Sequence, residues 1–103
     1  LGKARSETAA VQLGQIASAL DLYYIDNGRY PIEAEGLAAL MQPTGNAPRW
    51  NGPYLKKAQG LLDPWGRSYV FRFPGKHGPF DLYSLGADGR AGGEGDNRDV
   101  LSW

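Results

Sequence analysis

The sequence contains no cysteine, a single histidine and no apolar run near the length of a membrane span. Without cysteine there is no disulfide scaffold, no thiolate nucleophile and no cysteine-ligated zinc site. Crossing a bilayer needs a run of about 20 apolar residues, so we expect this chain as given not to span one. No signal peptide is recognisable. These absences are compatible with any compartment.

An excess of positive charge is also missing. Eleven Lys and Arg balance eleven Asp and Glu, whereas a nucleic-acid-binding domain needs a basic face that neutralises phosphates. We therefore expect no nucleic-acid partner. The 103 residues make one domain, residues 1–103, with a modest core. Three Trp, six Tyr and three Phe supply much of that core.

An amphipathic pattern occupies the first quarter of the chain. Apolar residues recur at the 4-3-4-3 spacing that lines one helical face, and they predict a helix over residues 4–25. The stripe consists of Ala9, Leu13, Ile16, Leu20 and Tyr23, widened by Ala10, Ala17 and Tyr24. Asn27 and Gly28 are suited to end this helix. Ser6 is a candidate N-cap, and the alternative is a helix that continues from a preceding membrane segment.

The second half of the chain changes period. Residues 33–41 predict a short helix, and residues 63–66 a tight turn with Pro second and Gly fourth. Alternating residues over 68–73 and 80–85 predict two strands of an antiparallel hairpin. Residues 100–103 have strand character and are expected at the sheet edge. The expected fold class is therefore α+β, with one long helix packed on a small antiparallel sheet.

Residues 85–99 form an acidic segment that holds five of the fifteen glycines. Ordering so much glycine costs backbone entropy, and the segment has few apolar side chains to offset that cost. Its acidic residues are Asp88, Glu94, Asp96 and Asp99. Carboxylates at this spacing are typical of a hard cation with oxygen ligands, most plausibly Ca²⁺. The alternative is a solvated acidic loop.

An EF-hand does not explain this segment. Asp88 to Asp99 has the required twelve residues, with Gly93 at the sixth position. However, Arg90 and Gly92 stand where an EF-hand has Asp or Asn, and no helix is expected to flank the loop. Carboxylates combined with backbone carbonyls remain able to satisfy Ca²⁺.

Enzymatic chemistry finds little support in the residue types. The one histidine, His77, lies in a predicted hairpin loop, where a solvated side chain is expected. There is no Gly-x-Ser-x-Gly turn and no phosphate-binding Gly-Lys-Ser/Thr motif. We expect a protein that is not an enzyme. A small periplasmic enzyme that uses the acidic loop is the competing hypothesis.

Several motifs occur in an order that is typical of one family. They include Asp26-Asn27-Gly28-Arg29-Tyr30-Pro31, Asp63-Pro64-Trp65-Gly66, Pro74-Gly75-Lys76-His77-Gly78-Pro79-Phe80-Asp81 and Ser84-Leu85-Gly86-Ala87-Asp88-Gly89. On these motifs the chain resembles the major pseudopilins of the type II secretion system, the G pseudopilins. Members of that family usually open with Gly-Phe-Thr-Leu-x-Glu and a hydrophobic helical half, and neither is in this sequence.

The resemblance implies a type IV pilin-like fold and a non-enzymatic role. Family members polymerise into a homopolymeric periplasmic fibre, the pseudopilus, which supports export of folded proteins across the outer membrane. The implied partners are other copies, minor pseudopilins and the inner-membrane secretion platform of a Gram-negative bacterium. The implied location is the inner membrane, contacted only through the N-terminal helix, with this domain in the periplasm. The alternative is a type IV pilin-like subunit for adhesion or motility, although such pilins commonly close their C-terminal loop with a disulfide.

The resemblance also implies a Ca²⁺ site in the C-terminal loop. Carried onto this sequence, the ligands are the Asp88 and Asp99 side chains and the Leu85 carbonyl. Asp96, Asn97 and the Arg90 carbonyl complete the candidate set. Calcium is the only cofactor that the resemblance implies.

Overall fold

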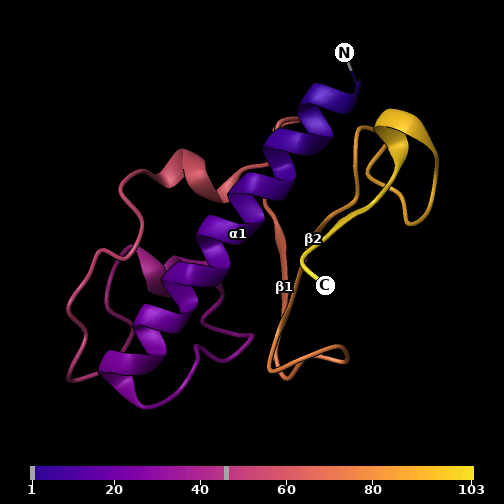
Figure 1. The fold of residues 1–103 in the computed structure, drawn as a ribbon. Helices are drawn as coiled ribbons and strands as arrows, with labels where there is room; N and C mark the ends of the chain where they lie inside the picture. Colours follow the sequence, from indigo (N-terminus) through magenta and orange to yellow (C-terminus); the bar gives the residue numbers. More distant parts are fainter. Residues whose placement is uncertain (1, 46) are drawn as a thin grey trace.

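A long N-terminal helix spans the molecule. The computed structural model of the protein describes residues 2–45 and 47–103, and its first element is the helix α1, Gly2–Asn27 (Figure 1). Its 26 residues, at a rise of about 1.5 Å each, give a length of about 39 Å. That length nearly matches the 42 Å long axis of the molecule, so the remaining elements lie alongside this helix.

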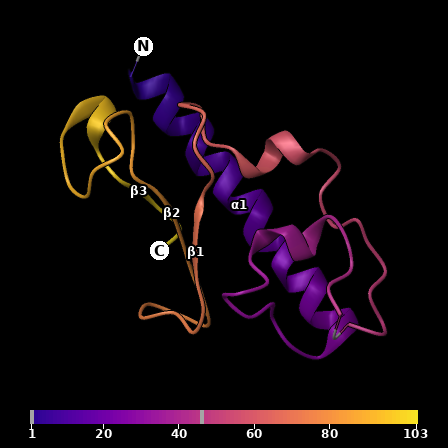
Figure 2. The same cartoon turned by 180° about the vertical axis from the view of Figure 1, so that it is seen from behind.

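A three-stranded antiparallel sheet packs against α1. Its order is β1-β2-β3, with β1 at Val70–Arg72, β2 at Asp81–Ser84 and β3 at Val100–Leu101. Phe71 pairs with Leu82, and Ser84 pairs with Val100. The predicted hairpin and the predicted edge position of residues 100–103 are therefore confirmed, although each strand is shorter than expected. The two opposite views show the sheet along one side of the helix (Figures 1 and 2).

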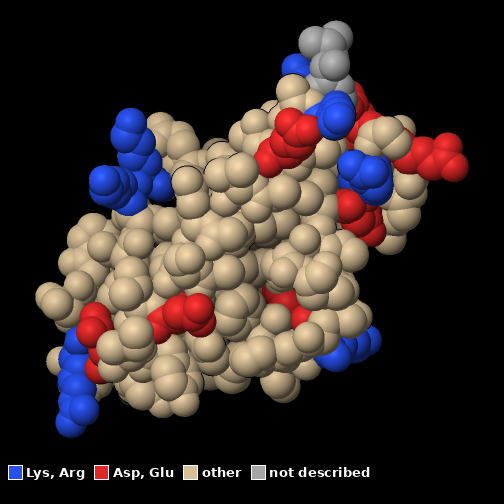
Figure 3. All heavy atoms as spheres, in the orientation of Figure 1, with Lys and Arg blue, Asp and Glu red and all other residues tan. Residues whose placement is uncertain are grey.

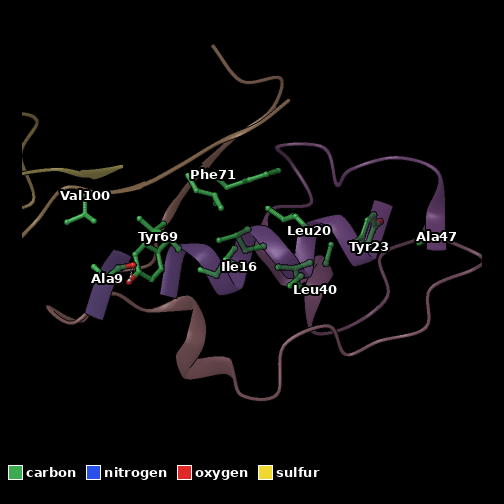
Figure 4. Close-up of a cluster of buried hydrophobic side chains, with 14 residues drawn as sticks. Ala9, Ile16, Leu20, Tyr23, Leu40, Ala47, Tyr69, Phe71 and Val100 are labelled. Atoms are coloured by element: carbon green, nitrogen blue, oxygen red, sulfur yellow. Dashed lines mark hydrogen bonds between the residues drawn. The ribbon is translucent and has the colours of Figure 1, made fainter. Parts of the chain in front are cut away.

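The predicted stripe on α1 forms the centre of the core. Ala9, Leu13, Ile16, Leu20 and Tyr23 are all almost completely buried. Figure 4 shows this row of side chains facing Tyr69 and Phe71 from the sheet and Leu40 from the loop region. The predicted widening by Ala10 and Tyr24 is wrong, because both are exposed, and Ala17 is only partly buried. Ala19 is buried instead. α1 also contacts segments outside the sheet, and helical periodicity alone does not predict where those segments pack.

The two ends of α1 differ in how well they were predicted. The helix ends after Asn27, where Gly28 has a φ of 73° and donates its N–H to the Tyr24 carbonyl at 2.8 Å. This confirms the predicted C-terminal stop. Ser6 is not the N-cap, because α1 already includes Gly2. Ser6 lies inside the helix with only 6% of its surface exposed.

The loops outside α1 and the sheet contain short 3₁₀ helices. The predicted helix over 33–41 is reduced to a 3₁₀ helix η1, Leu37–Leu40, because Gly36 precedes it at a positive φ of 65° that does not continue a helix. A second 3₁₀ helix, η2, covers Ala58–Leu61, and a third, η3, covers Gly95–Asn97. Trp50 folds back on the core, and its Nε1 donates to the Ala39 carbonyl at 2.7 Å.

Among the described residues, no helix combines the length and the apolar character that a bilayer crossing requires.

Candidate functional site

The acidic glycine-rich segment, residues 85–99, connects β2 to β3 and lies beside the first turns of α1. Both views show it as a projecting loop at the N-terminal end of the helix (Figures 1 and 2). Because β2 and β3 are hydrogen-bonded neighbours, the two ends of the loop are brought together by the sheet. The sheet therefore closes the neck of the loop before any ion is considered.

Backbone contacts hold the neck of the loop tightly. The Ala87 N–H donates to the Asp96 carbonyl at 2.8 Å. Gly86 has a φ of 78°, and a Cβ at this position would lie 2.6 Å from the Arg98 carbonyl oxygen. Only glycine combines this conformation with so close an approach. The neck therefore requires Gly86, and it places Leu85 and Gly86 beside Asn97 and Arg98.

Polar side chains outside the loop support this neck. The Arg67 guanidinium donates to the carbonyls of Gly86 and Ala87 at 2.8 and 3.1 Å. The Ser84 hydroxyl donates to Asp63 Oδ2 at 2.8 Å and accepts the Gly86 N–H at 3.1 Å. Sequence reasoning missed Asp63, Arg67 and Ser84 as part of the site. The turn at 63–66 and the motif that begins at Ser84 are visible in the sequence, but neither shows which loop these residues contact.

Two of the predicted aspartates each have one buried carboxylate oxygen that lacks a hydrogen-bond partner. Asp96 Oδ1 and Asp99 Oδ1 are both buried, and neither has a hydrogen-bond partner among the described residues. The other oxygen of Asp99, Oδ2, accepts the Gly92 N–H at 3.1 Å. An unpaired buried carboxylate oxygen is costly, so these two atoms fit a site that receives a cation.

The remaining predicted ligands divide into two groups. Leu85 and Asp99 line the same hollow of about 580 Å³ on the outer side of the sheet, so the structure brings these two together. Asn97 packs at the neck, where its backbone meets Gly86. Asp88 is exposed, and its Oδ1 accepts the Arg90 N–H at 3.0 Å. That contact occupies one Asp88 oxygen within a local turn and leaves the other oxygen available.

Side-chain ligands alone do not form a metal site in the acidic segment. Across residues 2–45 and 47–103, no three His, Asp or Glu side chains gather closely enough to hold a metal ion. Asp88, Asp96 and Asp99 are therefore not a three-carboxylate cluster. Ca²⁺ takes six to eight oxygen ligands and readily uses backbone carbonyls, so the residues present fit a site built from two carboxylates and loop carbonyls.

His77 is exposed, as expected for a solvated loop side chain, and it also makes ordered contacts. Its ring stacks on Trp103, with centroids 4.1 Å apart, and its Nδ1 lies 3.1 Å from Asp81 Oδ2. Burial raises the pKa of Asp81, but the N–H groups of Lys76 and His77 and the His77 ring outweigh that effect and leave the pKa below its usual range. These contacts link His77 to a carboxylate and to an aromatic ring, which is a structural arrangement.

Charges of both signs surround the loop. Figure 3 shows acidic and basic side chains interspersed over the projecting end of the molecule. The loop itself carries Arg90 and Arg98 alongside its four acidic residues. This mixture disfavours a phosphate site and leaves a locally acidic segment in a neutral chain.

Comparisons with known proteins agree on one family. The family model described as protein G of the type II secretion system matches residues 1–103. The type II secretion system core protein G of Pseudomonas aeruginosa is 47% identical, over 98% of this chain and 72% of that protein. The corresponding protein of Vibrio cholerae is 40% identical, over 98% and 70%.

A solved structure gives the same result for the fold. The major pseudopilin from the type 2 secretion system of enterohaemorrhagic Escherichia coli matches with a TM-score of 0.81 and 30% identity. The match covers 98% of this chain and 84% of that one. The expected pilin-like architecture is therefore confirmed.

Proposed function

Because the chain belongs to the protein G family of the type II secretion system, we propose that it is a structural subunit of a pseudopilus that supports the export of folded proteins across the outer membrane. The observation that carries this proposal is the family match over all 103 residues. The likeness of the whole fold to a major pseudopilin supports it independently.

An exposed apolar face on α1 supports self-assembly into a fibre. Val11, Leu22 and Ile25 are 63%, 52% and 74% exposed. They lie on the part of the helix that the sheet does not cover, and contiguous exposed apolar surface is typical of interaction sites. Val11 and Leu22 also line a groove of about 740 Å³ that α1 forms with residues 54–60. This groove is a candidate contact surface between copies.

The second part of the proposal is that Ca²⁺ closes the acidic loop and stabilises the subunit. Asp99 and Asp96 supply the buried unpartnered oxygens. The Leu85 carbonyl, at the edge of the same hollow as Asp99, is the first backbone ligand. Asp88, Asn97 and the Arg90 carbonyl are further candidates in the loop. The ion would supply positive charge and fixed coordination where the loop has few apolar contacts.

The proposed partners and location follow the same family assignment. They are further copies of this chain, minor pseudopilins and the inner-membrane secretion platform. We place the described domain in the periplasm and its attachment to the inner membrane in an N-terminal helix outside this sequence. A periplasmic location suits Ca²⁺ binding, because sites outside the cytosol work at about 10⁻⁴–10⁻³ M Ca²⁺.

Secretion is the direct test of the assembly role. The full-length gene, expressed in a secretion-competent strain that lacks its own protein G, is expected to restore both a cross-linkable fibre and release of exoprotein into the medium. Twitching motility measured in parallel tests the adhesion or motility alternative. Restored motility without secretion would overturn the secretion role in favour of that alternative.

Thermal unfolding with and without Ca²⁺ tests the calcium part. Saturating Ca²⁺ is expected to raise Tm, because a ligand that binds only the folded state stabilises it by mass action. Adding EGTA should reverse the rise, and Asp99→Ala should abolish it. Asp21→Ala, at an exposed position in the second half of α1, is the matched control and should keep the full rise. An unchanged Tm across the EGTA titration would remove calcium from the proposal.

A further inference from the structure

Two unpartnered buried oxygens come from residues that line one hollow, where the first turns of α1 lie beside the end of the acidic loop. Among the described residues, six buried side-chain polar atoms have no hydrogen-bond partner. Asp96 Oδ1 and Asp99 Oδ1 come from the loop, and Ser6 Oγ comes from α1. An unsatisfied buried polar group is costly. Ser6 and Asp99 are far apart in the sequence, so only the packing of α1 against the loop brings these two unsatisfied groups to one place.

Ser6 and Asp99 line a common hollow. It has a volume of about 380 Å³ and lies between residues 3–10 of α1 and residues 98–103. α1 also contacts η3 and β3, the elements on either side of Asp99. Figure 4 shows Val100 facing Ala9 at this end of the core. The Ser6 hydroxyl is thus covered by the segment that carries Asp99.

A serine within a helix can donate its hydroxyl to a backbone carbonyl of the preceding turn, without any contact from another element. Thr8, two residues further along α1, donates its hydroxyl to the Ala4 carbonyl at 3.0 Å, the usual bond to the preceding turn. Ser6 has no such bond among the described residues, although it is 6% exposed. The Ser6 hydroxyl is therefore available to donate a hydrogen bond towards the loop.

We propose that Ser6 is a positioning residue for the calcium loop, and this inference rests on the proposed Ca²⁺ site. The two atoms are not hydrogen-bonded to each other directly, and the proposed link is one ordered water that accepts from the Ser6 hydroxyl and donates to Asp99 Oδ1. A carboxylate only accepts hydrogen bonds, and the water supplies the missing hydrogen. Because the Gly92 N–H already holds Oδ2, the link from Ser6 fixes the carboxylate at both oxygens. Each oxygen has a second lone pair, so Asp99 Oδ1 can still face the ion.

This arrangement couples the loop to α1. Tyr69 also holds this half of the helix, because its hydroxyl donates to Gln12 Oε1, and Val100 belongs to the same core cluster as Ala9. An ion that orders Asp99 would therefore also order residues 3–10 through Ser6. Calcium binding then acts on the helix as well as on the loop.

Ser6→Ala tests the proposal, with Ser18→Ala as the matched control on the exposed side of the same helix. Ca²⁺ affinity is measured by calorimetric titration. Hydrogen exchange of residues 3–10 is measured with Ca²⁺ and with EGTA. Partners that orient a metal ligand are typically worth 10–100-fold in affinity, so Ser6→Ala should raise the Kd about tenfold. It should also lose most of the Ca²⁺-dependent protection of residues 3–10, whereas Ser18→Ala should match the wild type.

The outcomes separate the inference from the calcium proposal itself. If the wild-type protein binds no Ca²⁺, the proposed site fails and this inference fails with it. If the wild type binds Ca²⁺ and Ser6→Ala keeps the same Kd and the same protection, only the role of Ser6 is overturned. An equal fall in Tm with and without Ca²⁺, at unchanged Kd, would show that Ser6 is simply a packed serine.

Discussion

Glu35 shows at the scale of one residue how this chain manages a buried charge. Its carboxylate accepts a 2.7 Å ion-pair hydrogen bond from Arg29, the Ile32 N–H at 2.9 Å and the Thr44 hydroxyl. The hydrogen bond from Arg29, followed by those from Thr44 and Ile32, outweighs burial and lowers the pKa of Glu35 to about 2. One side chain thereby ties the turn after α1 to the following loop.

Asp63 is a second carboxylate that accepts several hydrogen bonds. It is 5% exposed, and its Oδ1 accepts the N–H groups of Trp65 and Arg67 at 3.0 and 2.9 Å. Its Oδ2 accepts the Ser84 hydroxyl. Because each buried carboxylate is met by several donors, these acids fix the turns between elements.

The Glu35 contact predicts a specific acid sensitivity. A folded-state pKa below the ordinary value of 4.5 means that Glu35 contributes stability above that value and loses it as the pH falls towards about 2. Glu35→Gln should therefore unfold more easily at pH 7, by about 1–3 kcal/mol. It should also lose less stability than the wild type between pH 4.5 and 2.

Urea unfolding at a series of pH values measures this difference, and Glu7→Gln on the exposed helix surface serves as the control. Parallel stability curves for wild type and Glu35→Gln below pH 4.5 would contradict the assignment.

At the scale of elements, the acidic loop depends on glycine for two separate reasons. Gly92 and Gly93 both have positive φ angles, 82° and 94°. A Cβ on Gly92 would meet no atom within 4 Å, but one on Gly93 would lie 2.4 Å from the Asn97 carbonyl oxygen. Conformation therefore constrains both positions, and close backbone packing constrains only Gly93.

Alanine at each position separates these two constraints. Gly92→Ala should cost about 1–2 kcal/mol, the usual penalty for a left-handed conformation with a Cβ. Gly93→Ala should cost about 1–3 kcal/mol more, because the Asn97 backbone must move. It should also weaken the Ca²⁺-dependent rise in Tm. Thermal unfolding of both variants, with and without Ca²⁺, checks the difference, and equal losses would argue against the tight packing at Gly93.

At the scale of the whole molecule, the core uses one side of α1 and leaves apolar residues on the other. Tyr23 and Leu20 are buried, while the neighbouring Leu22 and Ile25 are exposed. Lys56 and Lys57 border the groove that contains Leu22. A monomer gains nothing from this exposed surface, whereas a fibre subunit would bury it against another copy.

A polar substitution on this face should separate assembly from folding. Leu22→Asn is expected to change the stability of the domain by less than about 0.5 kcal/mol, because the side chain is already exposed. In the full-length gene it should reduce fibre cross-linking and secretion. Gln42→Asn, at an exposed position outside the groove, is the control. Normal secretion by Leu22→Asn would exclude this groove as a required contact.

The sequence by itself determined the elements whose signal is local. The 4-3-4-3 stripe specified the buried face of α1, because helical periodicity depends only on spacing along one chain. Gly28 specified where the helix ends, and alternation specified the hairpin. The ordered motifs also identified the family, which the comparisons confirmed.

Only the tertiary structure decided what meets the acidic loop. The roles of Arg67 and Ser84 at its neck, and the burial of Ser6 beside it, depend on which elements pack together. Sequence spacing suggested Ser6 as a cap, because the segment that lies against this residue is distant in the chain. It also did not show that the exposed His77 ring stacks on Trp103. Burial and hydrogen bonding between distant segments are set by the packing of α1 on the sheet, which no local pattern encodes.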